Sequence, residues 1–465
     1  MGCKFIILFL YLFIGLIKKY KSSTFKIKFK KYVSPPLKDF ILSIYNNDIY
    51  ISLKIGNPHQ NMDKIFLKSN THEFMIANKT IEKNNYNNSE SSTSKIVSVS
   101  QYYQLQYTFK GYIIKDHFYL NNNENENNNV DLIEIQNITF IYASRINIDN
   151  YTAIIGLKLD ENGVKKAKSL PEQLNELKYI KDSTWMIKYT SEKEGNFFLG
   201  EILNENVFPG FNKEEYRKTN AIIFGHYLSW DLLFAQIEFK NIKLNGPMQA
   251  NLDFNFGLIS CSNEYYNSIK NEFFNTHLKK GICNEYLYDY EDINNKIENI
   301  KSKFNYIVCK KSLNIKKFPK IKFYHTELDF VFELTYEDVF VTSNNKVYFL
   351  CINEIKNNQR WILGKTFFKK YNIIFDHGAK TIGIYGNYAK NKVNWIILEW
   401  FIVIILFLAF IFLLYTFIRR YRLNNYKSFE KRIKVDELNE QFYGEYKKEI
   451  NFKEIKEENK IIDGN

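Results

Sequence analysis

The stretch Trp361-Ile-Leu-Gly364 decides the fold, because a second stretch in the first half of the chain, Thr152-Ala-Ile-Ile-Gly156, resembles it. Each ends in an apolar pair followed by glycine. Such triplets are common, so the repeat gains weight only from its surroundings. Residues 49–55, 104–109 and 234–239 alternate in polarity or are rich in β-forming side chains, as expected of strands. The pattern predicts an all-β body with two similar halves.

The composition excludes several classes of protein. The 465 residues include 40 Phe and 34 Tyr, which supply far more buriable surface than a disordered chain carries. Five Cys are too few for a disulfide mini-scaffold. The net charge of +13 is almost entirely lysine, with acids and bases interleaved, so we expect no nucleic-acid partner. No zinc-binding His or Cys pattern and no phosphate-binding Gly-rich loop occurs, so we expect neither a metal nor a cofactor.

Apolar segments near the two ends of the chain indicate that the protein enters the secretory pathway and is anchored in a membrane. A short basic start, an apolar run over residues 5–17 and a lysine pair predict a secretory signal over residues 1–22, with an uncleaved anchor as the alternative. Within residues 394–418, the segment Trp395 to Ile418 is almost unbroken in its apolar character apart from Glu399, and Arg419, Arg420 and Arg422 follow at once. This pattern predicts one transmembrane helix with its N-terminal side in the lumen or outside the cell, and a cytosolic tail over residues 419–465.

A lumenal or extracellular location makes disulfide bonds and N-linked glycosylation the expected covalent modifications. The four lumenal cysteines favour two disulfides, because the compartment is oxidising and the count is even, and spacing alone allows three pairings. Asn-x-Ser/Thr sequons at four positions agree with a glycosylated surface, although such short patterns also arise by chance. They begin at Asn78, Asn87, Asn137 and Asn150.

Several segments together resemble the pepsin-like aspartic protease family. Ile55-Gly-Asn-Pro-His-Gln60 is similar to the family's Ile-Gly-Thr-Pro-x-Gln, and residues 251–259 are similar to its second Asp-Thr-Gly-Thr-Ser-Leu-Ile loop. Cys309 with residues 318–323 is similar to the Cys and Leu-Pro-x-Ile-x-Phe passage. Residues 361–376 are similar to Trp-Ile-Leu-Gly-x-x-Phe, Tyr and Val-Phe-Asp. The resemblance covers about residues 45–388, and the layout looks most like the membrane-anchored plasmepsins.

The resemblance implies a bilobal, all-β pepsin-like fold with pseudo-twofold symmetry and one C-terminal transmembrane helix. The expected lobes are residues 40–205 and 206–390, with a cleft for an extended peptide between them. It also implies disulfides joining Cys309 to Cys351 and Cys261 to Cys283.

Proteolysis in this family needs two carboxylates that share a proton across the lobe interface. Alignment backwards from Phe74 places the first of them at Lys68, and alignment forwards from Ile55 places it at Leu67. Neither residue is an acid. The second position keeps its acid, Asp253, although Phe and Asn replace the Thr and Gly that normally follow. The alternative interpretation of Asp253 is a loop acid without a role.

Two hypotheses follow for the site. Lys68 faces Asp253 and forms an ion pair with it, which lowers the cost of burying either charge alone. The flap that closes over a substrate contains Tyr107 and Gly111, with Tyr102 and Tyr103 as alternatives for the flap tyrosine and strand packing as an alternative role. The bulky Phe254 and Phe256 could fill the cleft.

The leading functional prediction is a non-catalytic, membrane-tethered aspartic protease homologue that binds a client polypeptide or acts as a scaffold in the secretory lumen or at the cell surface. One alternative is an active aspartic endopeptidase in which another acid replaces the missing one. A second alternative is a type I receptor or adhesion-type protein that uses the fold as a platform.

Overall fold

The computed structural model describes residues 24–32, 40–77, 86–104, 107–121, 132–143, 153–159, 168–224, 227–289, 302–355, 360–386 and 392–462. The expected signal sequence, residues 1–22, lies outside these ranges, as do the sequons at Asn78 and Asn150. The chain divides into two compact units, Met1–Asn387 and Tyr388–Asn465.

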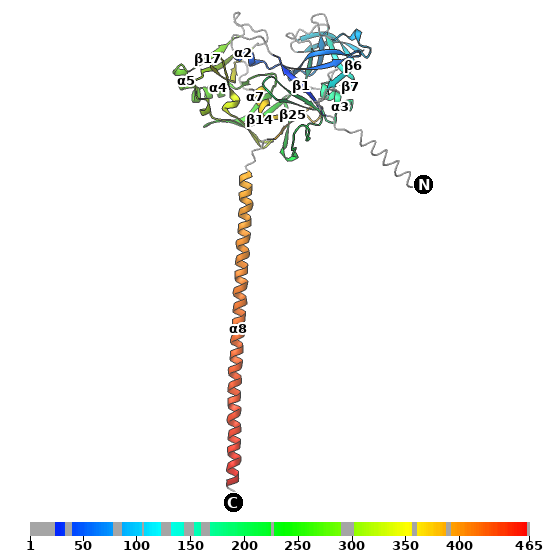
Figure 1. Ribbon diagram of the computed structural model, residues 1–465. Coiled ribbons are helices and arrows are strands. Elements are labelled where there is room, and N and C mark those ends of the chain that lie inside the picture. The colour runs from blue at the N-terminus through cyan, green and yellow to red at the C-terminus, as the bar shows by residue number, and fades with distance from the viewer. Residues whose placement is uncertain are drawn as a thin grey trace, which may run out of the picture. The chain divides into compact units, whose positions relative to one another are not determined.

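The first lobe is built from strands that follow one another closely along the chain. Its elements are β1 (Phe25–Lys31), α2 (Phe40–Tyr45), β2 (Ile49–Ile55), β3 (Gln60–Lys68), β4 (Phe74–Ala77), β5 (Lys95–Gln104), β6 (Tyr107–Asn121), β7 (Leu132–Ala143), β8 (Ala153–Gly156), α3 (Leu170–Glu176), β9 (Thr184–Tyr189) and β10 (Glu194–Leu199). Figure 1 shows β6 and β7 in blue and cyan at one side of the first unit, away from the green second-lobe helices α4 and α5.

The second lobe repeats this β-rich plan with more helical turns. Its strands are β11 (Tyr216–Asn220), β12 (Ile222–Phe224), β13 (Tyr227–Ser229), β14 (Asp231–Phe239), β15 (Ile242–Leu252), β16 (Ile259–Ser260), β17 (Cys283–Tyr288), β18 (Phe304–Lys310), β19 (Ile321–His325), β20 (Phe330–Leu334), β21 (Phe340–Ser343), β22 (Lys346–Phe349), β23 (Cys351–Glu354), β24 (Trp361–Leu363), β25 (Asn372–Asp376) and β26 (Thr381–Tyr385). Its helices include α4 (Asn263–Ile269), α5 (Asn275–Lys279), α6 (Tyr336–Val339) and α7 (Lys365–Lys370).

Strands from both halves of the chain share one sheet. Among the described residues, the 13-stranded sheet runs β11-β26-β25-β9-β10-β1-β2-β3-β8-β4-β7-β6-β5. The 11-stranded sheet contains β20-β19-β14-β15-β24-β16-β23-β18-β22-β21, with β17 beside β18. Antiparallel pairing of β25 with β9 places Phe375 opposite Trp185 and joins the two lobes. The result is two curled sheets connected by a shared strand layer, as the sequence predicted.

The same three-strand arrangement occurs once in each lobe. In the first lobe, β8 runs parallel to β3, with Leu67 opposite Ile155, and antiparallel to β4. In the second lobe, β24 runs parallel to β15, with Leu252 opposite Leu363, and antiparallel to β16. The internal repeat seen in the sequence therefore consists of equivalent strands in the two lobes.

Each of these repeats ends in glycine because no side chain fits there. A Cβ on Gly156 would lie 2.5 Å from the carbonyl oxygen of Thr71, and a Cβ on Gly364 would lie 2.3 Å from the carbonyl oxygen of Phe256. Real Cβ atoms essentially never approach backbone that closely. The apolar-apolar-glycine pattern thus records two places where a loop crosses directly over a strand.

Aromatic side chains fill the layer between the lobes. Trp185 is fully buried and stacks on Phe375 with 4.1 Å between ring centroids, and Trp230 packs edge-on against both rings. The indole Nε1 of Trp230 donates a hydrogen bond of 2.7 Å to the carbonyl of Leu157 in the first lobe. Burial of such large rings is a major apolar contribution to stability. The bond satisfies the indole N–H of Trp230, whereas that of Trp185 is buried without a partner among the described residues.

The disulfide pairing differs from the expected one. Cys283 and Cys309 lie opposite each other on the antiparallel strands β17 and β18 and form a disulfide. Cys261 and Cys351 are buried free thiols within hydrogen-bonding reach of each other. The expected pairs Cys309–Cys351 and Cys261–Cys283 are therefore wrong. The register of β17 on β18, which spacing along the sequence does not reveal, brings Cys283 to Cys309.

The second unit consists of one helix, α8 (Lys392–Ile462). Within it, Val403–Arg422 is long and apolar enough to cross a membrane. Twenty residues at ~1.5 Å rise each match the ~30 Å hydrocarbon core of a bilayer. The predicted span of residues 394–418 lies within α8 and overlaps this stretch.

Candidate active-site region between the lobes

The retained acid, Asp253, lies in a tight turn at the end of β15. Its carboxylate Oδ1 accepts a hydrogen bond of 2.9 Å from the backbone N–H of Asn255, and its carbonyl accepts one of 3.1 Å from the N–H of Phe256. Phe254 points into the core, where its ring centroid lies 5.9 Å from that of Trp185. The turn is therefore held by its own backbone and by an aromatic anchor.

The strand register identifies Lys68 as the first-lobe counterpart of Asp253. Leu67 and Leu252 occupy equivalent positions beside the repeated glycine strands. Lys68 follows Leu67 directly, and Asp253 follows Leu252 directly. Of the two alignments that the sequence allowed, this register matches the one that places Lys68, and not Leu67, at the first-lobe position.

Lys68 forms an ion pair that the sequence did not predict. Its Nζ lies 2.5 Å from Oδ1 of Asp48, and the two side chains are 12% and 9% exposed. Asp48 belongs to the first lobe and directly precedes β2. Removing both charges from water is costly, so the pair persists because each ion compensates the other.

The first-lobe side chain that hydrogen-bonds to Asp253 is Ser69. Its hydroxyl donates to Oδ1 of Asp253, and its backbone N–H donates to Oδ1 of Asn255 over 2.8 Å. The amide of Asn255 in turn donates to the carbonyl of Leu67 over 2.8 Å. These bonds join the two turns across the interface. The predicted ion pair between Lys68 and Asp253 is replaced by a serine bond to Asp253 and by the Lys68–Asp48 pair.

Asn47 fixes the segment that presents Asp48. Its backbone N–H donates to the carbonyl of Asn255 over 2.6 Å, and its amide donates to the carbonyl of Phe254 over 2.7 Å. The same amide contacts the hydroxyl of Tyr189 at 2.5 Å. Asn47 is fully buried, so these bonds are needed to satisfy its N–H groups. Its place before β2, with no charge of its own, gave no sequence signal for this role.

The surroundings of Asp253 shift its pKa in opposite directions. Burial raises the pKa of Asp253 above its usual range, while bonds from Ser69 and Asn255 and the nearby Lys68 cation lower it. The Asp48 carboxylate raises it further. Burial is the largest influence, so the protonated form of Asp253 is favoured relative to an exposed aspartate.

A polar cavity of about 510 Å³ opens beside Asp253. Residues of both lobes line it: Ser69, Asn70, Lys158, Leu228, Ser229, Trp230, Gln249, Asn251, Leu252, Asp253 and Arg360. Among these described residues Asp253 is the sole carboxylate. The guanidinium of Arg360 is bound by the buried acid Asp231, which also accepts hydrogen bonds from Gln249 and Asn251.

The two aromatic residues that flank Asn255 do not fill this cavity. Phe254 is fully buried against Trp185 and Phe368, and Phe256 is 6% exposed and packs on Tyr45 of α2. The sequence left open whether they fill the cleft, and neither lines this cavity. Each side chain turns into a hydrophobic core, where an aromatic ring gains more from burial than it would in a wet groove.

The predicted flap residues lie on the hairpin of β5 and β6. Tyr107 pairs with Gln104 next to the hairpin turn, and its side chain lies outside the described part of the chain, as do those of Tyr102 and Tyr103. Gly111 lies opposite Ala143 of β7, where a Cβ would meet the carbonyl oxygen of Tyr142 at 2.5 Å. Gly111 thus permits close strand packing in the sheet.

The arrangement differs from a proton-sharing dyad in its chemistry. A dyad needs a base that activates water and a neutral acid that donates to the scissile carbonyl. Here one carboxylate receives a hydroxyl from Ser69, and the equivalent position carries an ammonium bound to Asp48. The described residues contain no cluster of three or more His, Cys, Asp or Glu side chains placed to hold a metal ion.

This chain has two curled sheets and two equivalent turns that meet between the lobes, which is the arrangement of pepsin-like proteins. The family model for eukaryotic aspartyl proteases matches residues 50–386, so the chain belongs to that family. A search of curated proteins found no match.

Proposed function

We propose that this protein is a non-catalytic, membrane-anchored member of the aspartyl protease family, of the plasmepsin-like kind, which binds a polypeptide between its lobes. The observation that carries the proposal is Lys68, which stands at the position equivalent to Asp253 and is held there by Asp48.

A cation at this position works against the acid–base mechanism. The family's dyad depends on two like charges that cannot both ionise, which keeps one carboxyl neutral near its working pH. An ammonium has the opposite effect, because it favours the ionised form of Asp253 and offers no base for water. The single carboxylate of the cavity cannot take both roles.

The cavity is suited to holding a polypeptide by hydrogen bonds. Its lining contains the carboxamides of Asn70, Gln249 and Asn251, the hydroxyl of Ser229 and the ammonium group of Lys158. Such groups match the carbonyls, N–H groups and polar side chains of an extended chain. We therefore assign the cavity to a client polypeptide and not to a small apolar ligand.

The membrane arrangement follows from α8 and its flanking charges. Val403–Arg422 is the candidate span, and Arg419, Arg420 and Arg422 lie at its C-terminal end. Basic residues collect on the cytoplasmic side of spans. We therefore place the two lobes in the secretory lumen or outside the cell and residues 419–465 in the cytosol, as a single-pass type I protein.

A hydrolysis assay on the full chain in detergent tests the loss of catalysis. A quenched fluorescent peptide library is incubated with the protein between pH 4 and pH 7, with and without a statine-type inhibitor, and with Asp253→Asn as the matched variant. We expect wild type and variant to release the same background signal. Cleavage that is both inhibitor-sensitive and absent from the variant would show an active enzyme.

One observation favours a second candidate function, an active endopeptidase. Asp48 is a first-lobe acid close enough to raise the pKa of Asp253. If Lys68 left Asp48, two carboxylates would remain near the interface. In that case Asp48→Asn would abolish hydrolysis as completely as Asp253→Asn, whereas the non-catalytic proposal expects no hydrolysis to abolish.

A further inference from the structure

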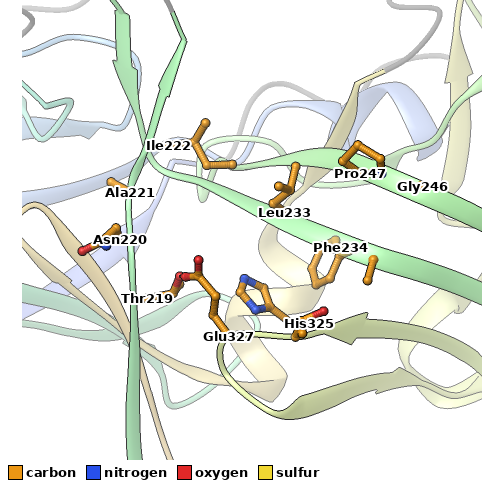
Figure 2. Close-up of a pocket in the computed structure, with 12 residues that line it drawn as sticks. Thr219, Asn220, Ala221, Ile222, Leu233, Phe234, Gly246, Pro247, His325 and Glu327 are labelled. Atoms are coloured by element: carbon orange, nitrogen blue, oxygen red, sulfur yellow. The ribbon is translucent and has the colours of Figure 1, made fainter.

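A second pocket, of about 570 Å³, lies in the second lobe and shares no lining residue with the interlobe cavity among the described residues. It is formed by the end of β11, by β14, by the irregular part of β15 at Gly246 and Pro247 and by the loop between β19 and β20 (Figure 2). Its size falls within the ~300–1,000 Å³ that is usual for ligand sites.

One wall of the pocket is apolar. Leu233 is 45% exposed, Phe234 is buried, and Ile222 and Pro247 complete the surface. Figure 2 shows Leu233 and Pro247 in the upper part of the view, and Thr219, His325 and Glu327 below them. This wall suits an aliphatic or aromatic group of modest size.

The opposite end presents a buried hydrogen-bond donor. His325 is 4% exposed, and its Nδ1 lies 3.2 Å from the backbone N–H of Leu328. Because that N–H donates, Nδ1 is an acceptor and the ring proton resides on Nε2. No partner for Nε2 occurs among the described residues, and burial lowers the pKa of His325, which keeps the ring neutral. Nε2 is not fully buried and His325 lines the pocket, so this N–H is available to a ligand acceptor.

A carboxylate stands beside this donor. Figure 2 shows the Glu327 side chain next to the imidazole of His325, with both groups directed into the pocket. The hydroxyl of Thr219 donates to Oε2 of Glu327, which orients the carboxylate and leaves Oε1 for another donor. The pocket therefore offers one donor and one acceptor side by side, next to an apolar wall.

The donor of His325 and the acceptor of Glu327 together favour some ligand groups over others. An ammonium would satisfy Glu327 but leave the Nε2–H of His325 without an acceptor. A carboxylate would satisfy His325 but be repelled by Glu327. An amide satisfies both, because its C=O accepts and its N–H donates. Unpaired polar groups left in a filled pocket cost affinity, so the amide is the best match.

We propose that this pocket is a second polypeptide-binding site, which holds one peptide amide between His325 and Glu327 and an adjacent apolar side chain against Leu233 and Pro247. The site is separate from the interlobe cavity and does not depend on whether that cavity binds or cleaves its ligand.

The test uses the full chain in detergent micelles with N-acetyl-L-leucinamide as the probe. Binding is followed by saturation-transfer NMR, with protein-free micelles as the blank. We expect a Kd on the order of 1 mM, as is usual for so small a ligand. N-acetylglycinamide, which lacks the apolar group, should bind about tenfold more weakly, and isopentylamine, which lacks the amide, should also bind more weakly.

Variants assign the binding to this pocket. Glu327→Ala and Leu233→Ser change exposed positions and should each weaken binding about tenfold. His325→Phe keeps an aromatic ring and should also weaken binding. Glu214→Ala, an exposed acid elsewhere on the second lobe, is the matched control and should leave Kd unchanged. The proposal is overturned if the probe does not bind, if Glu327→Ala binds as tightly as wild type, or if the amine binds more tightly than the amide.

Discussion

Breaking the Lys68–Asp48 ion pair should destabilise the protein far more than breaking an exposed pair. The two side chains are 12% and 9% exposed, so removal of one charge takes away the ion that the other contacts at 2.5 Å in a largely buried place. Loss of one member of a buried pair typically costs 3–5 kcal/mol, and the residual exposure here favours the lower end, about 3 kcal/mol. At roughly 2 °C per kcal/mol for a body of this size, Lys68→Met should lower the midpoint of thermal unfolding by about 6 °C.

A double-mutant cycle separates the pair from other effects of the substitution. Asp48→Asn should cost about as much as Lys68→Met, whereas the double variant should regain most of the loss, because no unpaired charge remains. Lys168→Met is the control, since its pair with Glu176 is 53% exposed on both sides and is worth at most about 1 kcal/mol.

The assay is differential scanning fluorimetry of the full chain in one detergent at fixed scan rate, because unfolding of such a chain is often irreversible. A loss of less than about 2 °C for Lys68→Met, or a double variant as unstable as the sum of the single ones, would refute the assignment of a mutually compensated buried pair.

Three further predictions concern ionisable groups. Burial raises the pKa of Asp253, so the folded state loses stability as the pH rises from 3.8 through the folded-state pKa. The thermal unfolding midpoint of Asp253→Asn should therefore rise relative to that of wild type between pH 4 and pH 7. Burial lowers the pKa of His325, so stability should fall as the pH drops below 6.5, and His325→Phe should show a shallower fall between pH 7 and pH 5. Burial raises the pKa of the Cys261 thiol, and Cys351 is buried beside it, so iodoacetamide should label these two cysteines only after unfolding; peptide mapping that finds either of them labelled in the native protein would contradict this.

The sequence predicted the fold through its resemblance to the pepsin-like family, and the structure gives a steric reason for part of that pattern. The repeated glycines Gly156 and Gly364 are required by loops that cross directly over strands, and that requirement leaves the same pattern in both halves. The strand segments alternate because one face of each packs on a core. The alternation is visible within each strand segment, whereas the steric reason for the glycines appears only once the distant loops are placed over them.

The candidate site was predicted only in part, because its bonds are made between distant segments. The position of Lys68 followed from alignment, but its partner Asp48 lies 20 residues earlier in the chain. Ser69 and Asn255 meet across 186 residues. The pairing of Cys283 with Cys309 likewise depends on strand register. Small polar residues such as Asn47 are ordinary in composition, and their roles become visible only once the turns are placed together.

The central claim, that the interlobe site does not hydrolyse peptide bonds, is tested most directly by isotope labelling. The full chain and its Asp253→Asn variant are incubated separately with an unfolded protein mixture in H₂¹⁸O between pH 4 and pH 7. Newly formed C-termini that carry ¹⁸O are then counted by mass spectrometry. We predict equal counts for the two proteins at every pH. Labelled C-termini that the wild type produces and the variant does not would contradict the claim.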